Sequence, residues 1–367
     1  MQIAIVGLAG SGKTTVFNTL TRGHAETGGY GGVTLNVGVV KVPDERLDRL
    51  AEIFKPKKTV QADVTYVDLP APPASTEGRV GTEELPADHL ARLRESDALL
   101  HVVRAFDDPA HPHPAGSVDP ARDLEQLDLE FTLADLAMAE RRVERLKTSG
   151  RHGTQAEREA AEREEVVLRR IHEALEAGTP IRDIGLDPDE AKAIRGFRFL
   201  TEKPVLVLLN VGEGDLATAP SLVERVSDGY PHQHAMVDAL SAKIEMELGE
   251  LEPHEAAAFM EELGITESSL DRVIALSYRL LGLVSFLTAG PDEVRAWPIA
   301  DGSTAVDAAG AIHTDLAKGF IRAETVAYED LVTLGSMAEA KKAGRLRSEG
   351  KTYRVKDGDV LEILFSR

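Results

Sequence analysis

The sequence predicts an α/β fold built on a doubly wound, mostly parallel sheet, with a helical insertion and a small C-terminal α+β domain. Three observations support this. Short, continuously apolar runs recur along the chain with helical material between them. A long segment with helical spacing separates the third run from the fourth, and short strand-like segments follow residue 283. Continuously apolar runs are typical of parallel strands that are buried on both faces.

The first apolar run, residues 2–6 (QIAIV), ends at Gly7 and is followed by a helix-like segment from Thr14 to Leu20. A strand, a loop and a helix in this order are what a parallel sheet requires. The later runs lie at residues 64–69, 98–103 and 205–209, with a weaker candidate at 235–240. We expect these runs to form the other strands of the sheet.

The insertion lies at residues 121–177, which are dense in Glu, Arg, Leu and Ala and are interrupted by TSGRHGT at 148–154. This pattern predicts an antiparallel helical hairpin, a two-stranded coiled coil with a structural role. After residue 283, the segments VRAWPI, AAGAIH, FIRAETVAY and KTYRVKDGDVLEILF are interpreted as strands of a β-grasp-like domain. The predicted domains are therefore residues 1–125 with 203–282, residues 126–202, and residues 283–367.

The composition of the chain excludes several classes of function. The 367 residues carry a net charge of −20, which argues against a surface that coats nucleic acid generally but leaves room for local basic patches. The absence of cysteine excludes disulfides, thiolate metal sites and cysteine nucleophiles. No apolar stretch is long enough to span a membrane, and no signal-peptide pattern is present. We therefore expect a cytoplasmic monomer without a membrane or DNA partner.

A phosphate-binding motif follows the first strand. GLAGSGKTT, Gly7 to Thr15, matches G-x-x-x-x-G-K-[ST] between a strand and a helix. Its glycines let backbone N–H groups approach phosphate oxygens, and the helix N-terminus adds a positive dipole end. Lys13 is expected to reach the β- and γ-phosphates, and the Thr14 hydroxyl to bind Mg²⁺. The candidate nucleotide-binding residues here are Gly10, Ser11, Gly12, Lys13, Thr14 and Thr15.

Two further residues are candidates for the Mg²⁺ shell. Asp68 ends the strand VTYVD, where a P-loop protein places its metal-associated carboxylate. Thr34, in the glycine-rich stretch GGYGGVTLN, is the candidate switch-loop threonine. The alternative for Asp68 is an ordinary strand-end aspartate in a turn. The alternative for Thr34 is a position in a glycine-rich surface loop.

With these residues placed, the chain resembles the Obg-like ATPase (YchF) family of translation-factor-class P-loop NTPases. The resemblance spans nearly the whole length. It rests on NVGVVKVPDERLDRLAEIFKPKK (36–58), GSVDPARDLE (116–125), TLADLAMAERRVERL (132–146), AAGAIHTDLAKGFIRAETVAYEDL (308–331) and EGKTYRVKDGDV (349–360). It implies a nucleotide domain, a coiled-coil insertion and a C-terminal TGS domain. It also implies ATP hydrolysis and association with ribosomes.

The base-binding motif departs from that of guanine-nucleotide switches, which read Asn-Lys-x-Asp after a buried strand. Here Asn210 is followed by Val211 and Glu213. The lysine packs over the base and steadies the P-loop. Val211 cannot steady the P-loop, and the longer Glu213 would not lie in the plane of guanine. The residues thus disfavour guanine. The resemblance implies adenine, because the family carries Asn-x-x-Glu here, and SAK (241–243) resembles the loop whose backbone contacts the base, which adds Ser241 and Ala242.

The sequence supports nucleotide hydrolysis less strongly than nucleotide binding. The x-x-Gly position after Asp68 is Ala71, and the water-orienting Gln position is Pro72. The resemblance offers His113 as the water-positioning residue, and the alternative is a solvent-exposed loop histidine. A metal site at His111 and His113 is weaker still, because no further ligands lie nearby in the sequence.

Basic residues cluster in two places despite the acidic total. The arm carries Arg141, Arg142, Arg145 and Lys147, and the C-terminal domain carries Lys341, Lys342, Arg345, Arg347, Lys351, Arg354 and Lys356. The arm cluster is interpreted as a solvated face, and the second cluster as a phosphate contact for ribosomal RNA, which the resemblance favours. The sequence thus predicts a Mg²⁺-dependent, slowly hydrolysing ATP switch that associates with ribosomes or RNA and binds GTP more weakly. The alternatives are a non-catalytic nucleotide-gated module and a GTPase.

Overall fold

The computed structural model describes residues 1–23, 26–30, 33–69, 86–149, 154–263, 265 and 268–366. The chain forms two compact units. The first comprises Met1–Gly38 with Thr65–Leu270, and the second comprises Val39–Val64 with Asp271–Arg367. The three-domain division predicted from the sequence is finer than these units and stays a prediction.

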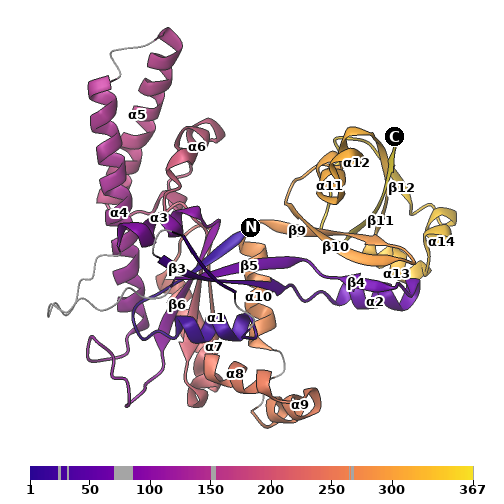
Figure 1. Cartoon of the computed structure of the whole chain (residues 1–367), viewed down its shortest axis with the longest axis horizontal. Coiled ribbons are helices and arrows are strands. Elements are labelled where there is room, and N and C mark those ends of the chain that lie inside the picture. The colour runs from indigo at the N-terminus through magenta and orange to yellow at the C-terminus, as the bar shows by residue number, and fades with distance from the viewer. Residues whose placement is uncertain are drawn as a thin grey trace. The chain divides into compact units, whose positions relative to one another are not determined.

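A seven-stranded sheet in the order β2-β3-β5-β1-β6-β7-β8 is the centre of the first unit (Figure 1). Its strands are β1 (Gln2–Val6), β2 (Glu26–Tyr30), β3 (Val33–Lys41), β5 (Asp63–Asp68), β6 (Ala98–Ala105), β7 (Val205–Val211) and β8 (Ala235–Leu240). β5, β1, β6, β7 and β8 pair in parallel, and β2 pairs antiparallel with β3. Every apolar run predicted to be a strand is one, and the α/β fold class is confirmed.

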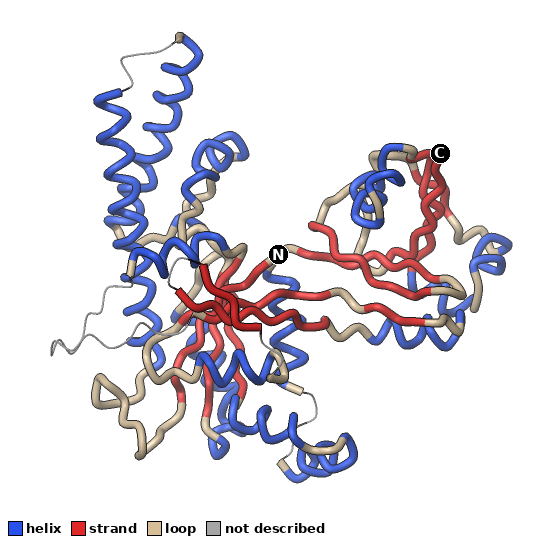
Figure 2. The backbone as a smooth tube through the Cα atoms, in the orientation of Figure 1, coloured by secondary structure: helices blue, strands red, loops and turns tan. Residues whose placement is uncertain are grey.

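Helices lie beside this sheet (Figure 2), and side chains of α3 (Ala87–Glu95), α4 (Pro120–Ser149) and α7 (Ala219–Gly229) join its core. The other helices of this unit, apart from the hairpin, are α1 (Lys13–Leu20), α6 (Pro188–Ile194), α8 (Ala242–Glu250) and α9 (Pro253–Glu262). Short 3₁₀ turns lie at Ile181–Asp183, Arg195–Phe197 and Glu213–Thr218. The core contains side chains from β1, β6, β7 and α7, including Ala4, Val103, Leu209 and Val226. This sheet brings the carboxyl ends of β1, β6 and β7 to one edge, where ligands bind in open α/β sheets.

The predicted helical hairpin is α4 (Pro120–Ser149) and α5 (Gln155–Glu176), which project from the sheet as an antiparallel pair (Figure 1). Thr154 and Glu157 form a capping box that begins α5. The helices pack through a core of their own that includes Val143, Leu168 and Ile171. At the base of the hairpin, buried Asp135 accepts from Arg94 at 2.7 Å and from the Thr201 amide at 2.8 Å.

The second unit contains a six-stranded sheet in the order β12-β11-β13-β9-β10-β4. Its strands are β4 (Lys58–Val60), β9 (Leu283–Ala289), β10 (Glu293–Ala300), β11 (Phe320–Ala327), β12 (Arg347–Glu349) and β13 (Asp359–Phe365). Its helices are α2 (Glu45–Phe54), α10 (Ser269–Leu280), α11 (Ala305–Ile312), α12 (Thr314–Lys318), α13 (Tyr328–Leu334) and α14 (Met337–Lys342). Alanines of α11 pack on the sheet beside Phe286 and Phe320.

One of the strands expected in this unit is wrong, and another is confirmed only in part. AAGAIH lies in α11, because Thr304 and Asp307 form a capping box and alanine strongly favours helix. Within KTYRVKDGDVLEILF only Asp359–Phe365 is a strand; the part before it is held by turns and by one bridge between Thr304 and Arg354. The expectations for VRAWPI and FIRAETVAY are confirmed by β10 and β11.

The segment between β3 and β5 belongs to the second unit, although the sequence suggested the nucleotide domain for it. β4 pairs in parallel with β10. Arg46 of α2 donates to Asp44 at 2.8 Å and to Asp357 at 2.7 Å, and Asp357 accepts from the Ser285 amide. These bonds raise the pKa of Arg46 above its ordinary value. The chain that leaves the first unit along β3 therefore passes through the second before it returns along β5.

Candidate functional site

The phosphate loop lies between β1 and α1, and two glycines show why the motif needs them. Gly7 has φ +151°, and a Cβ there would lie 2.2 Å from the Val102 carbonyl oxygen of β6. Gly12 has φ +90°, and a Cβ there would lie 2.3 Å from Nδ2 of Asn210. Both positions combine a left-handed backbone with close approach of a neighbour, which only glycine tolerates. Gly10, Ser11 and Thr15 lie in the same strand–loop–helix turn.

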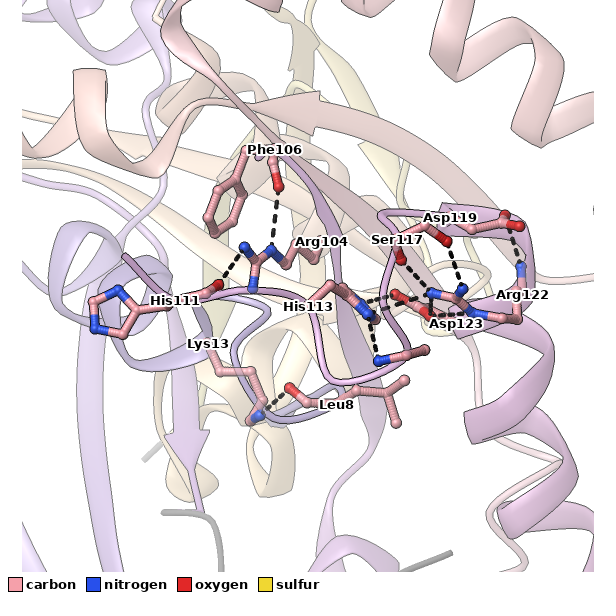
Figure 3. A network of polar contacts seen from close by, with 11 residues as sticks. Leu8, Lys13, Arg104, Phe106, His111, His113, Ser117, Asp119, Arg122 and Asp123 are labelled. Atoms are coloured by element: carbon pink, nitrogen blue, oxygen red, sulfur yellow. Dashed lines mark hydrogen bonds and ion pairs between the residues drawn. The ribbon is translucent and has the colours of Figure 1, made fainter. Parts of the chain in front are cut away.

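Lys13 begins α1 and bends back over the loop. Its Nζ donates to the Leu8 carbonyl oxygen at 2.8 Å (Figure 3). Burial lowers the pKa of Lys13, and the charge of Asp68 opposes this effect. A partly buried ammonium that is held by a carbonyl at a helix N-terminus is suited to bind an anion.

Thr14, Asn36 and Asp68 meet beside Lys13. The Thr14 hydroxyl donates to Oδ2 of Asp68 at 3.5 Å, and Nδ2 of Asn36 donates to the same oxygen at 3.4 Å. Asp68 is fully buried, and burial raises its pKa. Its Oδ1 has no hydrogen-bond partner among the described residues. One buried carboxylate with an unused oxygen beside a threonine hydroxyl fits Mg²⁺, which binds through one or two protein oxygens and the substrate phosphates.

The predicted Thr34 ligand falls partly outside what is described. The backbone of Thr34 belongs to β3 and pairs with Gly29, so this part of the glycine-rich stretch is a strand, whereas a loop was expected. Its side chain lies outside the described residues, as do Ala71 and Pro72. The assignment of Thr34 to the metal shell stays a prediction.

Asn210 links the base motif to the phosphate loop. Its Nδ2 donates to the Ser11 carbonyl oxygen at 3.0 Å, and its Oδ1 accepts from the Ala242 amide at 3.1 Å. The side chain is buried, so β7, the phosphate loop and the start of α8 are tied together at one point. Ser241 lies just before α8, and its buried Oγ has no hydrogen-bond partner among the described residues.

The other two motif residues, Val211 and Glu213, lie in different environments. Val211 is buried in the sheet core. Glu213 is about half exposed, and its carboxylate lies 3.4 Å from Nζ of Lys243. A carboxylate that reads guanine must accept from two base N–H groups, whereas Glu213 already has a cationic partner. The arrangement is therefore poorly suited to guanine.

His113 is held by a buried network (Figure 3). The Ala115 amide donates to Nδ1 at 3.1 Å, so Nε2 carries the hydrogen and donates to Asp123 at 2.8 Å. Asp123 also accepts from Arg122 at 2.8 Å. The His113 side chain is only 6% exposed, so the alternative of a solvent-exposed loop histidine is wrong. Both ring nitrogens are engaged, which supports a structural role; water positioning by His113 stays a prediction.

The metal site considered for His111 and His113 receives no support. His111 points to the surface and pairs with Asp108 at 2.8 Å. Within the described ranges, no group of three or more histidine, aspartate or glutamate side chains could hold a metal ion.

Two further polar side chains lie on β6. His101 is almost fully buried and pairs in register with Val6; burial, with smaller contributions from Lys13 and Arg182, lowers its pKa to about 3. Its imidazole is therefore neutral at ordinary pH. Arg104 lies at the carboxyl end of the strand, next to the phosphate loop. Both side chains border a crevice that is too narrow for a water molecule, beside Leu8, Ser11, His113 and Asp123.

Comparison with known proteins shows the family of this chain. The ribosome-binding ATPase YchF of Bacillus subtilis (strain 168) is 42% identical over 370 residues, which cover 100% of this chain and 99% of that protein. The chain belongs to the YchF family. The protein of the same name from Haemophilus ducreyi is 43% identical over 367 residues, with the same coverage. The structure of the Schizosaccharomyces pombe YchF GTPase matches with a TM-score of 0.85 and 31% identity, covering 99% of this chain and 97% of that one.

Two family models match separate parts of the YchF-family chain. One is described as a 50S ribosome-binding GTPase and matches residues 2–131. The other, the YchF GTPase C-terminal family, is described as a protein of unknown function and matches residues 283–366. The names of these relatives differ in the nucleotide: the bacterial proteins are called ATPases and the yeast protein is called a GTPase. The geometry around Val211 and Glu213 bears on this disagreement.

The site of this YchF-family chain unites most of the residues found from sequence. Lys13, Thr14 and Asp68 meet, and Asn210 joins Ser11 to Ala242. Sequence reasoning missed Asn36, His101 and Arg104. The signal for the last two was present, because polar residues interrupt an apolar strand whose carboxyl end borders the ligand edge of the sheet.

Proposed function

We propose that this chain is a Mg²⁺-dependent ATP-binding switch that hydrolyses ATP slowly and acts on ribosomes. The observation that carries the choice of ATP is the base motif, where Val211 is buried and Glu213 is paired with Lys243. Family membership supports the proposal, since the two bacterial relatives are named ribosome-binding ATPases. A cytoplasmic location and a monomeric state remain predictions.

The binding chemistry follows from the residues in place. The N–H groups of the phosphate loop and Nζ of Lys13 would hold the β- and γ-phosphates, and the neutral His101 beneath adds no charge. Thr14 and Asp68 would hold Mg²⁺, which when bound neutralises charge on the phosphate oxygens. Asn210 fixes the loop against α8, so base and phosphate positions are set together. Backbone groups near Val211 and Ala242 would pair with adenine.

A non-catalytic nucleotide-gated module is the second candidate. It is favoured by the engagement of both His113 nitrogens and by the sequence at Ala71 and Pro72. A turnover assay with ATP and with GTP, in the presence and absence of ribosomes, decides between them. We expect slow ATP turnover that is lost in Lys13→Ala. No turnover above that variant under any condition would support the module, and faster turnover of GTP would support a GTPase.

Ribosome association is proposed through the C-terminal basic cluster. Lys342 and Arg345 pair with Glu339 and Asp330, and Arg347 pairs with Asp359. Lys341, Lys351 and Lys356 are exposed, and none of them takes part in an ion pair within the described part of the chain. These three lysines, and the exposed Arg354, which donates to the Gly302 carbonyl oxygen, are therefore available for RNA phosphates.

The triple variant Lys341→Gln, Lys351→Gln, Lys356→Gln is expected to weaken ribosome binding and to reduce its dependence on salt. If each lysine contacts one phosphate, the slope of log K against log[salt] should fall by roughly 2 to 3. Co-sedimentation with ribosomes over a salt series measures this. The matched control removes three exposed cations elsewhere that also take part in no ion pair within the described residues, Lys55, Lys192 and Arg225. Equal effects of the two triple variants would count against a specific contact by the cluster.

A further inference from the structure

Arg104 is a buried cation at the edge of the nucleotide site, only 3% exposed. Its Nε donates to the Phe106 carbonyl oxygen at 3.1 Å and its Nη2 to the His111 carbonyl oxygen at 2.8 Å (Figure 3). The guanidinium also stacks on the Phe106 ring, 4.7 Å from its centroid. These contacts fix the plane of the guanidinium and leave Nη1 without a hydrogen bond among the described residues.

The charge of Arg104 has no anionic partner in the part of the chain that is described. Its contacts are neutral carbonyls and an aromatic ring, and it forms no ion pair with any described carboxylate. The nearby Asp108 pairs with His111, and Asp123 pairs with Arg122 and His113. A buried charge is costly unless it is paired, so this guanidinium is suited to an anionic ligand.

The free end of Arg104 faces the phosphate loop. An ideal Cβ built on Gly10 would lie 3.4 Å from Nη1. Arg104 pairs in register with Asn210 of β7, and Ala105 pairs with Val211. Arg104 therefore lies on β6 directly beside Asn210 of β7, one residue before the position where guanine-nucleotide switches carry the lysine that steadies the phosphate loop. In this chain that position is the buried, apolar Val211.

We propose that Arg104 is a second phosphate-binding cation of the nucleotide site, which supplies from β6 the positive charge that Val211 cannot supply from β7. Nη1 contacts the phosphate chain beside Gly10 while the other two nitrogens hold the segment from Phe106 to His111. Arginine suits this task better than lysine, because a rigid fork can bond two carbonyls and a phosphate at once. The inference rests on the nucleotide site proposed above.

The test compares ligands that share the base and differ in phosphate number. AMP, ADP and a non-hydrolysable ATP analogue are titrated into the wild type, Arg104→Gln and Arg104→Lys. Arg104→Gln is expected to weaken ADP and the analogue by roughly 10- to 100-fold. AMP should change by less than about threefold, since it has one phosphate. Arg104→Lys should recover part of the loss, because it restores a cation at the same strand position.

Arg182→Gln is the matched control. Arg182 is also buried in the first unit and also donates to backbone carbonyls, those of Thr201 and Lys203. Its loss should lower the unfolding midpoint while the ratio of ADP to AMP affinity stays that of the wild type. If Arg104→Gln leaves this ratio unchanged, by weakening all ligands equally or none, the inference is overturned. If Arg104→Gln does not fold, the same criterion applies to Arg104→Lys.

The outcomes also separate this inference from the proposed function. Wild type that binds ADP and the analogue, with an unchanged affinity ratio in the Arg104 variants, overturns the role of Arg104 alone. Wild type that binds none of the three ligands overturns the nucleotide site, and the role of Arg104 with it.

Discussion

Lys13→Ala is expected to abolish binding of ATP and of GTP alike. Nζ of Lys13 is the partly buried ammonium over the phosphate loop, bonded to the Leu8 carbonyl oxygen and next to Asp68. Two charge-assisted bonds to phosphate are worth roughly 3–6 kcal/mol, so the loss of affinity should exceed about a hundredfold. Equilibrium binding of a fluorescent nucleotide measures the change.

Lys192→Ala is the control for Lys13→Ala, because Lys192 is an exposed lysine of α6 in the same unit. It should bind nucleotide as the wild type does. Retention of nucleotide affinity within about threefold in Lys13→Ala would show that the ligand is not held by this loop, since no other lysine lies over it in the described structure.

Asp68→Asn is expected to remove the Mg²⁺ dependence of ATP binding and to lower turnover by roughly a hundredfold or more. The substitution keeps the size of the side chain and removes the carboxylate beside Thr14 and Asn36. Loss of a carboxylate contact to the metal costs several kcal/mol of transition-state stabilisation. Asp63→Asn, at the exposed other end of β5, removes only a surface pair with Lys41 and should leave turnover unchanged.

The Mg²⁺-dependent part of ATP affinity should also fall on mild acidification. Burial raises the pKa of Asp68, and the metal requires the ionised form, so protons compete with Mg²⁺ at a higher pH than for an exposed aspartate near 4. The stability of the metal-free protein should change in the opposite direction. Because the pKa of Asp68 is raised in the folded state, protonation of Asp68 stabilises the fold as the pH falls. Loss of Mg²⁺ dependence that begins only below about pH 4 would contradict the burial argument.

The sheet of the first unit could be predicted because its strands are continuously apolar and separated by helices. The second unit was harder. AAGAIH is short and apolar, and its periodicity does not separate strand from helix; the capping box at Thr304 decides it. Val39–Val64 belongs to the second unit because of long-range contacts, such as that of Arg46 with Asp357, and no local sequence pattern reveals these contacts.

The phosphate loop could be predicted because its motif combines a local backbone requirement with a local charge. Asn36 and Arg104 could not, because their roles depend on which strands become neighbours. Asn36 reaches Asp68 only because β3 lies beside β5 in the sheet. The environment of His113 was misjudged for the same reason: its loop sequence HPHP suggests exposure, and the contact that buries it comes from Asp123 of α4.

The central claim is that this site holds ATP in preference to GTP. Calorimetric titration of nucleotide-free protein with non-hydrolysable analogues of ATP and of GTP, in the presence of Mg²⁺, tests it most directly. The geometry at Asn210, Val211 and Glu213 predicts tighter binding of the ATP analogue. Tighter binding of the GTP analogue would contradict it.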